Sequence, residues 1–62
     1  MQLTLKQARN LSGLSRVKVG KEIGVDSKTI INWEKSKSYP NAKNFMLLCK
    51  LYGVSPNDII LP

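Results

Sequence analysis

The side chains that could do chemistry in this 62-residue sequence are mainly cations. Ten Lys and Arg stand against four Asp and Glu, which gives a formal net charge of +6. There is no His and only one Cys, so neither a His-centred catalytic triad nor a His/Cys metal cluster can be assembled. Lys and Arg neutralise phosphates, and the pI of about 9.8 is typical of nucleic-acid-binding domains. Charge alone also fits an acidic protein partner, a membrane surface or mere solubility.

The basic residues are concentrated between Arg16 and Lys43, where there are seven Lys and Arg and three acids. The elements that must position them are short helices, because no alternating strand pattern and no repeat is present. Thr4 and Gln7 form a capping box that predicts a helix from about Leu5 to Leu11, ending near Gly13. We therefore expect an all-α chain that forms a single domain over residues 1–62.

Further caps and glycines predict the remaining helices. Ser15 begins a helix over residues 16–23, and Asp26 is the expected N-cap of a helix over residues 27–35. A helix over residues 42–52 follows, and Ser55 caps a last helical turn. Only Gly24, Val25 and Asp26 separate the second helix from the third. Two short helices joined by a three-residue turn that contains Gly predict a helix-turn-helix unit.

An ordered set of short motifs resembles the Cro/lambda-repressor helix-turn-helix family, the Xre-like group. The matching residues are Gly13-Leu14-Ser15, Ile23-Gly24-Val25, Thr29-Ile30, Trp33-Glu34, Lys37-Ser38-Tyr39-Pro40 and Leu51-Tyr52-Gly53-Val54-Ser55. They span almost the whole chain, from about Leu5 to Ile60. The resemblance implies a compact five-helix, lambda-repressor-like fold that docks its third helix in the major groove of DNA.

Three residues depart from the pattern of the family. Arg16 stands where Gln usually begins the second helix, and Gly20 stands where Ala is usual. Ser36 replaces the Gly that commonly follows the third helix. If Ser36 adopts a left-handed backbone, we expect strain of about 1 kcal/mol.

The resemblance also implies which residues contact DNA. The outward face of the third helix is expected to read base edges, because Lys pairs with guanine, Asn with adenine, and apolar side chains with the thymine methyl. These residues are Ser27, Lys28, Ile31 and Asn32. A second group is expected to bind phosphates. Such contacts fix the position of the protein on the duplex but do not read the base sequence. This group comprises Arg16, Lys35, Lys37, Ser38, Tyr39 and Lys43. The alternative for both groups is that they are ordinary exposed residues.

Four conspicuous residues are interpreted as structural. Arg9 and Glu34 match family positions that pair between the first and third helices. Trp33 shares a face with Ile30 and is expected in the core, and Cys49 is expected to be a small buried hydrophobe.

A homodimer is the expected binding form, since family members usually occupy two half-sites through a two-fold axis. The predicted dimer surface combines the outer side of the fourth helix with the C-terminal end: Met46, Leu47, Leu51, Ile60 and Leu61. The alternative is a slightly apolar monomer surface.

The sequence thus predicts a sequence-specific, double-stranded-DNA-binding transcriptional regulator, a Cro-like repressor of phage, prophage or bacterial type. Its operator is expected to be pseudo-palindromic, and its dimer weak and completed on DNA. The alternative is an antitoxin-like module that binds a partner protein and uses DNA binding for autoregulation. We expect no enzymatic activity, no cofactor, metal or small-molecule ligand, and no membrane association. Because neither a signal peptide nor a long apolar run is visible, we expect a cytoplasmic protein.

Overall fold

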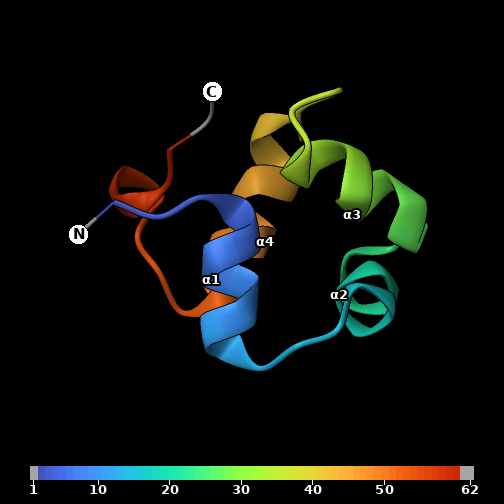
Figure 1. Ribbon diagram of the computed structural model, residues 1–62, viewed down its shortest axis with the longest axis horizontal. Coiled ribbons are helices and arrows are strands. Elements are labelled where there is room, and N and C mark those ends of the chain that lie inside the picture. Colours follow the sequence, from blue (N-terminus) through green and yellow to red (C-terminus); the bar gives the residue numbers. More distant parts are fainter. Residues whose placement is uncertain (1, 61–62) are drawn as a thin grey trace.

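The computed structural model describes residues 2–60, and in this part of the chain it contains four α-helices and one short 3₁₀ helix (Figure 1). The helices are α1 (Leu5–Ser12), α2 (Arg16–Ile23), α3 (Ser27–Glu34), α4 (Ala42–Tyr52) and η1 (Pro56–Asp58). The α-helical boundaries agree with the predicted ones to within one residue. The expected fifth helix is a single 3₁₀ turn, so the described chain has four α-helices where the resemblance implied five helices.

Most of the helices begin with an N-cap residue whose side chain accepts a hydrogen bond from the first turn. Thr4 Oγ1 accepts from the Gln7 N–H at 3.1 Å, and the Gln7 side chain accepts from the Thr4 N–H at 2.9 Å, which completes the predicted capping box. Ser15 caps α2 as predicted. Asp26 occupies the N-cap position of α3, but its side chain makes no cap hydrogen bond, so that part of the prediction is wrong.

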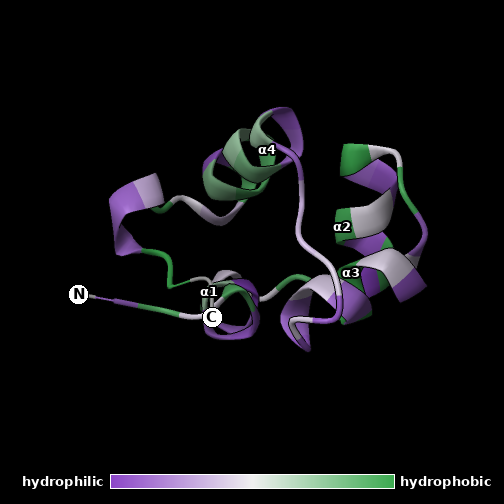
Figure 2. Cartoon of the chain, turned by 90° about the horizontal axis from the view of Figure 1, so that it is seen from above, coloured by the Kyte–Doolittle hydropathy of each residue, from purple (hydrophilic) through white to green (hydrophobic). Residues whose placement is uncertain are grey.

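The core lies where all four α-helices meet. Its buried side chains come from all four α-helices: Leu5, Ala8, Val19, Ile30, Trp33, Leu48, Cys49 and Tyr52. Trp33 and Cys49 are therefore core residues, as predicted. Seen from above, α4 lies across the molecule from α1 and α3, and its ribbon is largely apolar (Figure 2). Burial of apolar surface is the dominant favourable term for a domain of this size.

The two ends of the described chain are joined by a small parallel β-bridge between Leu3 and Ile59. The Leu3 N–H donates to the Asp58 carbonyl at 2.6 Å, and the Ile60 N–H donates to the Leu3 carbonyl at 2.7 Å. The sequence pattern did not predict this contact. Both ends consequently lie beside η1, on the side of the molecule away from α2 and α3 (Figure 1). None of the helices in residues 2–60 has the length and apolar character needed to span a membrane.

Candidate nucleic-acid interface

The turn between α2 and α3 packs directly on Gly20. A Cβ atom at Gly20 would lie 2.5 Å from the Val25 carbonyl oxygen, which is far inside ordinary contact distance. The Gly20 carbonyl accepts hydrogen bonds from the Gly24 N–H at 2.7 Å and the Val25 N–H at 2.9 Å. Gly24 has φ +89°, a left-handed conformation that glycine adopts without strain. The turn therefore holds α3 close against α2 in one arrangement.

The outer face of α3 carries the four residues predicted to read bases. Ser27, Lys28, Ile31 and Asn32 follow the helical repeat and so share one side of the helix. Lys28 is exposed and the other three are half-buried. The opposite side of α3 is buried in the core through Ile30 and Trp33. The helix is thus anchored on one side and presents polar and apolar contact groups on the other.

The C-terminal end of α3 is closed by a Schellman motif with serine in the left-handed position. Ser36 has φ +62°, which no other non-glycine residue in the described chain approaches. The Ser36 N–H donates to the Trp33 carbonyl at 3.3 Å, and the Lys37 N–H donates to the Asn32 carbonyl at 2.9 Å. Ser36 thus adopts the left-handed backbone for which strain was expected. It also fastens the following loop to the end of the helix.

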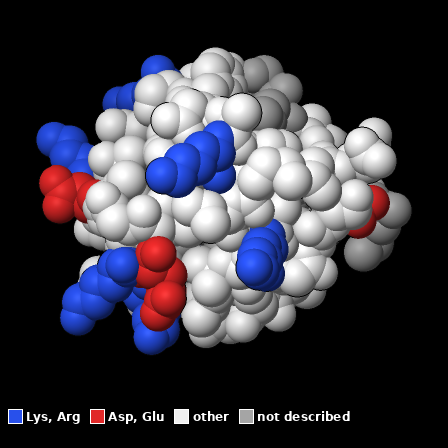
Figure 3. Space-filling view, turned by 180° about the vertical axis from the view of Figure 1, so that it is seen from behind, with Lys and Arg blue, Asp and Glu red and all other residues white. Residues whose placement is uncertain are grey.

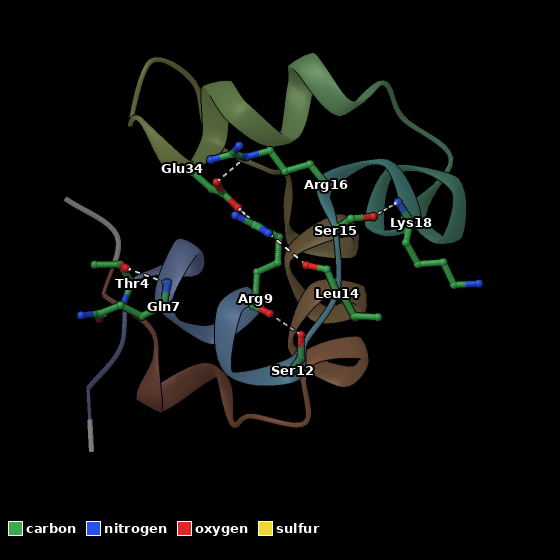
Figure 4. Close-up of polar contacts among 9 residues, drawn as sticks. All are labelled: Thr4, Gln7, Arg9, Ser12, Leu14, Ser15, Arg16, Lys18 and Glu34. Carbon is green, nitrogen blue, oxygen red and sulfur yellow. Dashed lines mark hydrogen bonds and ion pairs between the residues drawn. The ribbon is translucent and has the colours of Figure 1, made fainter.

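Glu34 joins α3 to two other elements of the fold (Figure 4). Its Oε2 accepts from Arg9 Nε at 2.6 Å, and its Oε1 accepts from Arg16 Nε at 3.0 Å. Arg9 also donates from Nη1 to the Leu14 carbonyl at 3.0 Å. The carboxylate is therefore held between α1 and the beginning of α2. The pairing of Arg9 with Glu34 was expected, whereas the bond from Arg16 was not.

A family model described as helix-turn-helix matches residues 5–59, which includes every helix described above. The chain belongs to the helix-turn-helix family of the Cro and Xre type. No curated protein and no solved structure shows significant similarity to it. Members of this family are DNA-binding transcription regulators, and double-stranded DNA is the partner that membership implies.

In this helix-turn-helix protein, most of the predicted phosphate-binding residues are exposed in the segment that follows α3 and at the beginning of α4. Lys35, Lys37, Ser38 and Tyr39 follow the helix, and Lys43 lies in the first turn of α4. Arg16 is different, because its side chain is only 37% exposed and its Nε is bonded to Glu34. That bond brings Arg16 next to the C-terminal end of α3.

The charge distribution of the helix-turn-helix protein is uneven. On the face seen from behind, Lys and Arg gather towards the side formed by α2 and α3, and the side nearest η1 shows none (Figure 3). None of the four α-helices has an acidic residue in its first turn. Arg16 and Lys43 add to the positive N-termini of α2 and α4, whereas at α3 the carboxylate of Asp26 at the N-cap partly offsets Lys28. This arrangement attracts an anionic partner.

The predicted dimer surface of the helix-turn-helix protein is only partly exposed. Met46 and Leu47 on α4 are 55% and 38% exposed, and Ile60 is exposed as well. Leu51 is half-buried and packs against the core, so it contributes less surface than expected. Leu61 lies outside the described residues. The apolar surface that remains is therefore smaller than the predicted set.

Two titratable groups in the core have displaced pKa values. Burial, with a smaller contribution from the negative charge of Glu34, raises the pKa of Tyr52 to about 12. Burial also raises the pKa of the Cys49 thiol. Both shifts favour the neutral form, as in a packed core. Within residues 2–60, no group of three or more His, Cys, Asp or Glu is placed to hold a metal ion.

Proposed function

We propose that this protein is a transcriptional repressor of bacterial or phage origin that reads a pseudo-palindromic operator with α3. The observation that carries the proposal is the fixed presentation of the outer face of α3. The helix is held at its beginning by the turn on Gly20, and at its end by the Schellman motif and by Glu34. Because the helix is already held in one position, little conformational entropy is lost when it binds in a groove.

The proposed base contacts follow from the chemistry of that face. Lys28 donates to guanine O6 and N7, and Asn32 forms a bidentate pair with adenine N6 and N7. Ile31 contacts a thymine methyl, and Ser27 hydrogen bonds to a base edge near the beginning of the helix. A major groove about 12 Å wide accommodates one α-helix, which is what the anchored α3 offers.

The proposed phosphate contacts come from the residues around α3. Lys35, Lys37, Ser38 and Tyr39 bind the backbone beyond the end of the helix, and Lys43 binds from the beginning of α4. Arg16 binds from the beginning of α2. The exposure of these three lysines and of Ser38 and Tyr39, together with the positive N-termini of α2 and α4, supports this assignment. Such contacts set the register of the helix and account for much of the affinity.

We propose that two copies pair weakly through the apolar surface formed by Met46, Leu47 and Ile60, and that pairing is completed on DNA. The exposed lysines Lys43 and Lys50 lie on the same helix, within four residues of Met46 and Leu47, so charge repulsion between two copies keeps the pairing weak in the absence of DNA. The dimer then places two reading helices one helical turn of DNA apart. Repression follows because a bound dimer sterically excludes polymerase from the promoter.

The same exposed surface on α4 supports a second function. An antitoxin-like protein would use Met46 and Leu47 to bind a different protein and would use α3 to regulate its own gene. Recovery of one stoichiometric, non-identical partner on purification from the native host would favour this alternative over the simple repressor. A single species that associates only with itself would favour the repressor.

Fluorescence anisotropy tests the proposed function. The native duplex upstream of the protein's own gene is compared with a shuffled duplex of equal length at ~0.15 M salt. We expect the native duplex to bind tighter by a factor of ~10³ or more. The variant Asn32→Ala should reduce that preference, whereas Lys37→Ala should weaken binding to both duplexes alike. Equal, weak binding of both duplexes would argue against a specific regulator of this promoter.

A further inference from the structure

The carboxylate of Glu34 is almost completely buried and has one arginine on each oxygen. Its side chain is 3% exposed, and the contacts are Arg9 Nε to Oε2 at 2.6 Å and Arg16 Nε to Oε1 at 3.0 Å. Such charge-assisted bonds have defined directions, because both the guanidinium and the carboxylate are planar. Glu34 therefore fixes the orientation of both arginines.

The two arginines differ in how much donor capacity they have left. Arg9 has a side chain only 10% exposed, and it uses a second nitrogen on the Leu14 carbonyl. The side chain of Arg16 is 37% exposed, and among residues 2–60 the bond from Nε to Glu34 is the only hydrogen bond that this side chain makes. A guanidinium has five N–H donors, so the Nη groups of Arg16 remain available on the outer side of the cluster. Figure 4 shows Arg16 extending from the beginning of α2 to Glu34.

We propose that Glu34 is a positioning residue for DNA binding, which holds Arg16 as a preorganised phosphate clamp beside the C-terminal end of α3. This inference rests on the proposed function. In the complex, Arg16 Nε keeps its hydrogen bond to Glu34, and the Nη groups donate to two oxygens of one phosphate. An arginine that is already ordered loses little rotamer freedom on binding, in contrast to the exposed lysines of the interface. Because Glu34 belongs to α3, the phosphate contact of Arg16 thereby fixes the position of α3 along the DNA backbone.

Simple electrostatics and positioning predict opposite effects for the substitution Glu34→Gln. The substitution raises the net charge by one, and charge alone would strengthen attraction to DNA. If Glu34 positions Arg16, the same substitution weakens DNA binding because Arg16 is released. The sign of the change therefore separates the two explanations.

The experiment compares Glu34→Gln, Arg16→Gln and the double variant on one non-operator duplex of about 25 base pairs, long enough for two half-sites. Affinity is measured by anisotropy over a salt series, and folding is checked by circular dichroism. Lys18→Gln is the matched control. It makes the same charge change as Arg16→Gln on the same helix, and it removes an exposed ion pair with Glu22.

We expect Arg16→Gln to weaken binding by about tenfold and to reduce the salt slope by about one phosphate contact. Glu34→Gln should also weaken binding, and the double variant should bind no more weakly than Arg16→Gln alone. Lys18→Gln should change the affinity by less than about threefold, with an unchanged salt slope.

Three results would overturn the inference. The first is equal or tighter binding by Glu34→Gln. The second is that Glu34→Gln lowers the affinity for DNA by the same factor whether or not Arg16→Gln is also present, which would mean that Glu34 acts through Arg9. The third is an unchanged salt slope for Arg16→Gln, which remains decisive if Glu34→Gln fails to fold. Absence of binding by the unmodified protein even at the lowest salt, where sequence-independent binding is strongest, would instead argue against DNA as the partner and so against the proposed function itself.

Discussion

Replacing Gly20 with alanine should destabilise this protein, although helix propensity predicts the reverse. Alanine in a helix interior is favoured over glycine by about 1 kcal/mol. The added Cβ would lie 2.5 Å from the Val25 carbonyl oxygen and 3.4 Å from the Ser27 nitrogen. Real Cβ contacts essentially never fall below 3.0 Å, so the turn would have to retreat by about 0.5 Å at least.

The turn cannot retreat without loss, because the Val25 N–H is bonded to the Gly20 carbonyl at 2.9 Å. Overpacking of this kind costs typically 1–3 kcal/mol, which exceeds the gain in propensity. We therefore expect Gly20→Ala to lower the free energy of unfolding by about 1 kcal/mol. In a domain of this size that corresponds to a fall in Tm of roughly 4–8 °C.

Urea and thermal denaturation followed by circular dichroism measure the effect, with Lys21→Ala as the control. Lys21 is the next residue of the same helix and is exposed, so its replacement should change stability by no more than about 0.5 kcal/mol. A Gly20→Ala variant that is about 1 kcal/mol more stable than the parent would refute the reasoning. It would mean that the turn yields freely and does not fix the position of α3.

Four further predictions follow from the same structure. Ser36→Gly should raise the free energy of unfolding by about 0.5–1 kcal/mol in urea titrations, because glycine removes the strain at φ +62°; an unchanged midpoint would show that the strain is absent. Stability should decline as pH rises from about 10, where Tyr52 ionises in the unfolded chain, to about 12, where it ionises in the folded protein. This decline is of the order of 2 kcal/mol, and Tyr52→Phe should be less sensitive over the same range. The buried Cys49 should react with a thiol reagent only at the rate of unfolding, and rapid labelling of native protein would contradict its burial. Leu47→Glu should weaken cooperative binding to a full operator by about tenfold without affecting a half-site; Leu11→Glu, at a residue 71% exposed on α1, should change neither, and equal effects of the two would argue against pairing through α4.

The helix boundaries could be predicted from the sequence because the signals that set them are local. Thr4 and Ser15 cap helices within three residues of their partners, so the pattern contains the whole interaction. Asp26 shows the limit of this reasoning. The tight turn places its backbone at the N-cap of α3, but the side chain does not reach an N–H of the first turn. A cap position is decided by the backbone, and a cap hydrogen bond also needs the right rotamer.

The parts of the site that the sequence did not predict depend on contacts between distant residues. Arg16 and Glu34 are 18 positions apart, and a long arginine side chain can bind either a carboxylate or a phosphate. The arginine in place of the usual glutamine, together with an acid already paired with Arg9, was the signal that could have indicated this bond. Leu51 was expected on the surface because it was grouped with Met46 and Leu47 on the outer side of α4. The structure packs it against the core instead.

The bridge between Leu3 and Ile59 has a practical consequence for handling this protein. It places both ends of the described chain on the side of η1, away from α2 and α3 (Figure 1). A fluorophore, an affinity tag or a whole fused domain attached to either end should therefore lie away from the proposed DNA-binding face of α3. Attachments at both ends at once would be neighbours in space, so a donor and acceptor pair placed there would report whether the bridge is closed.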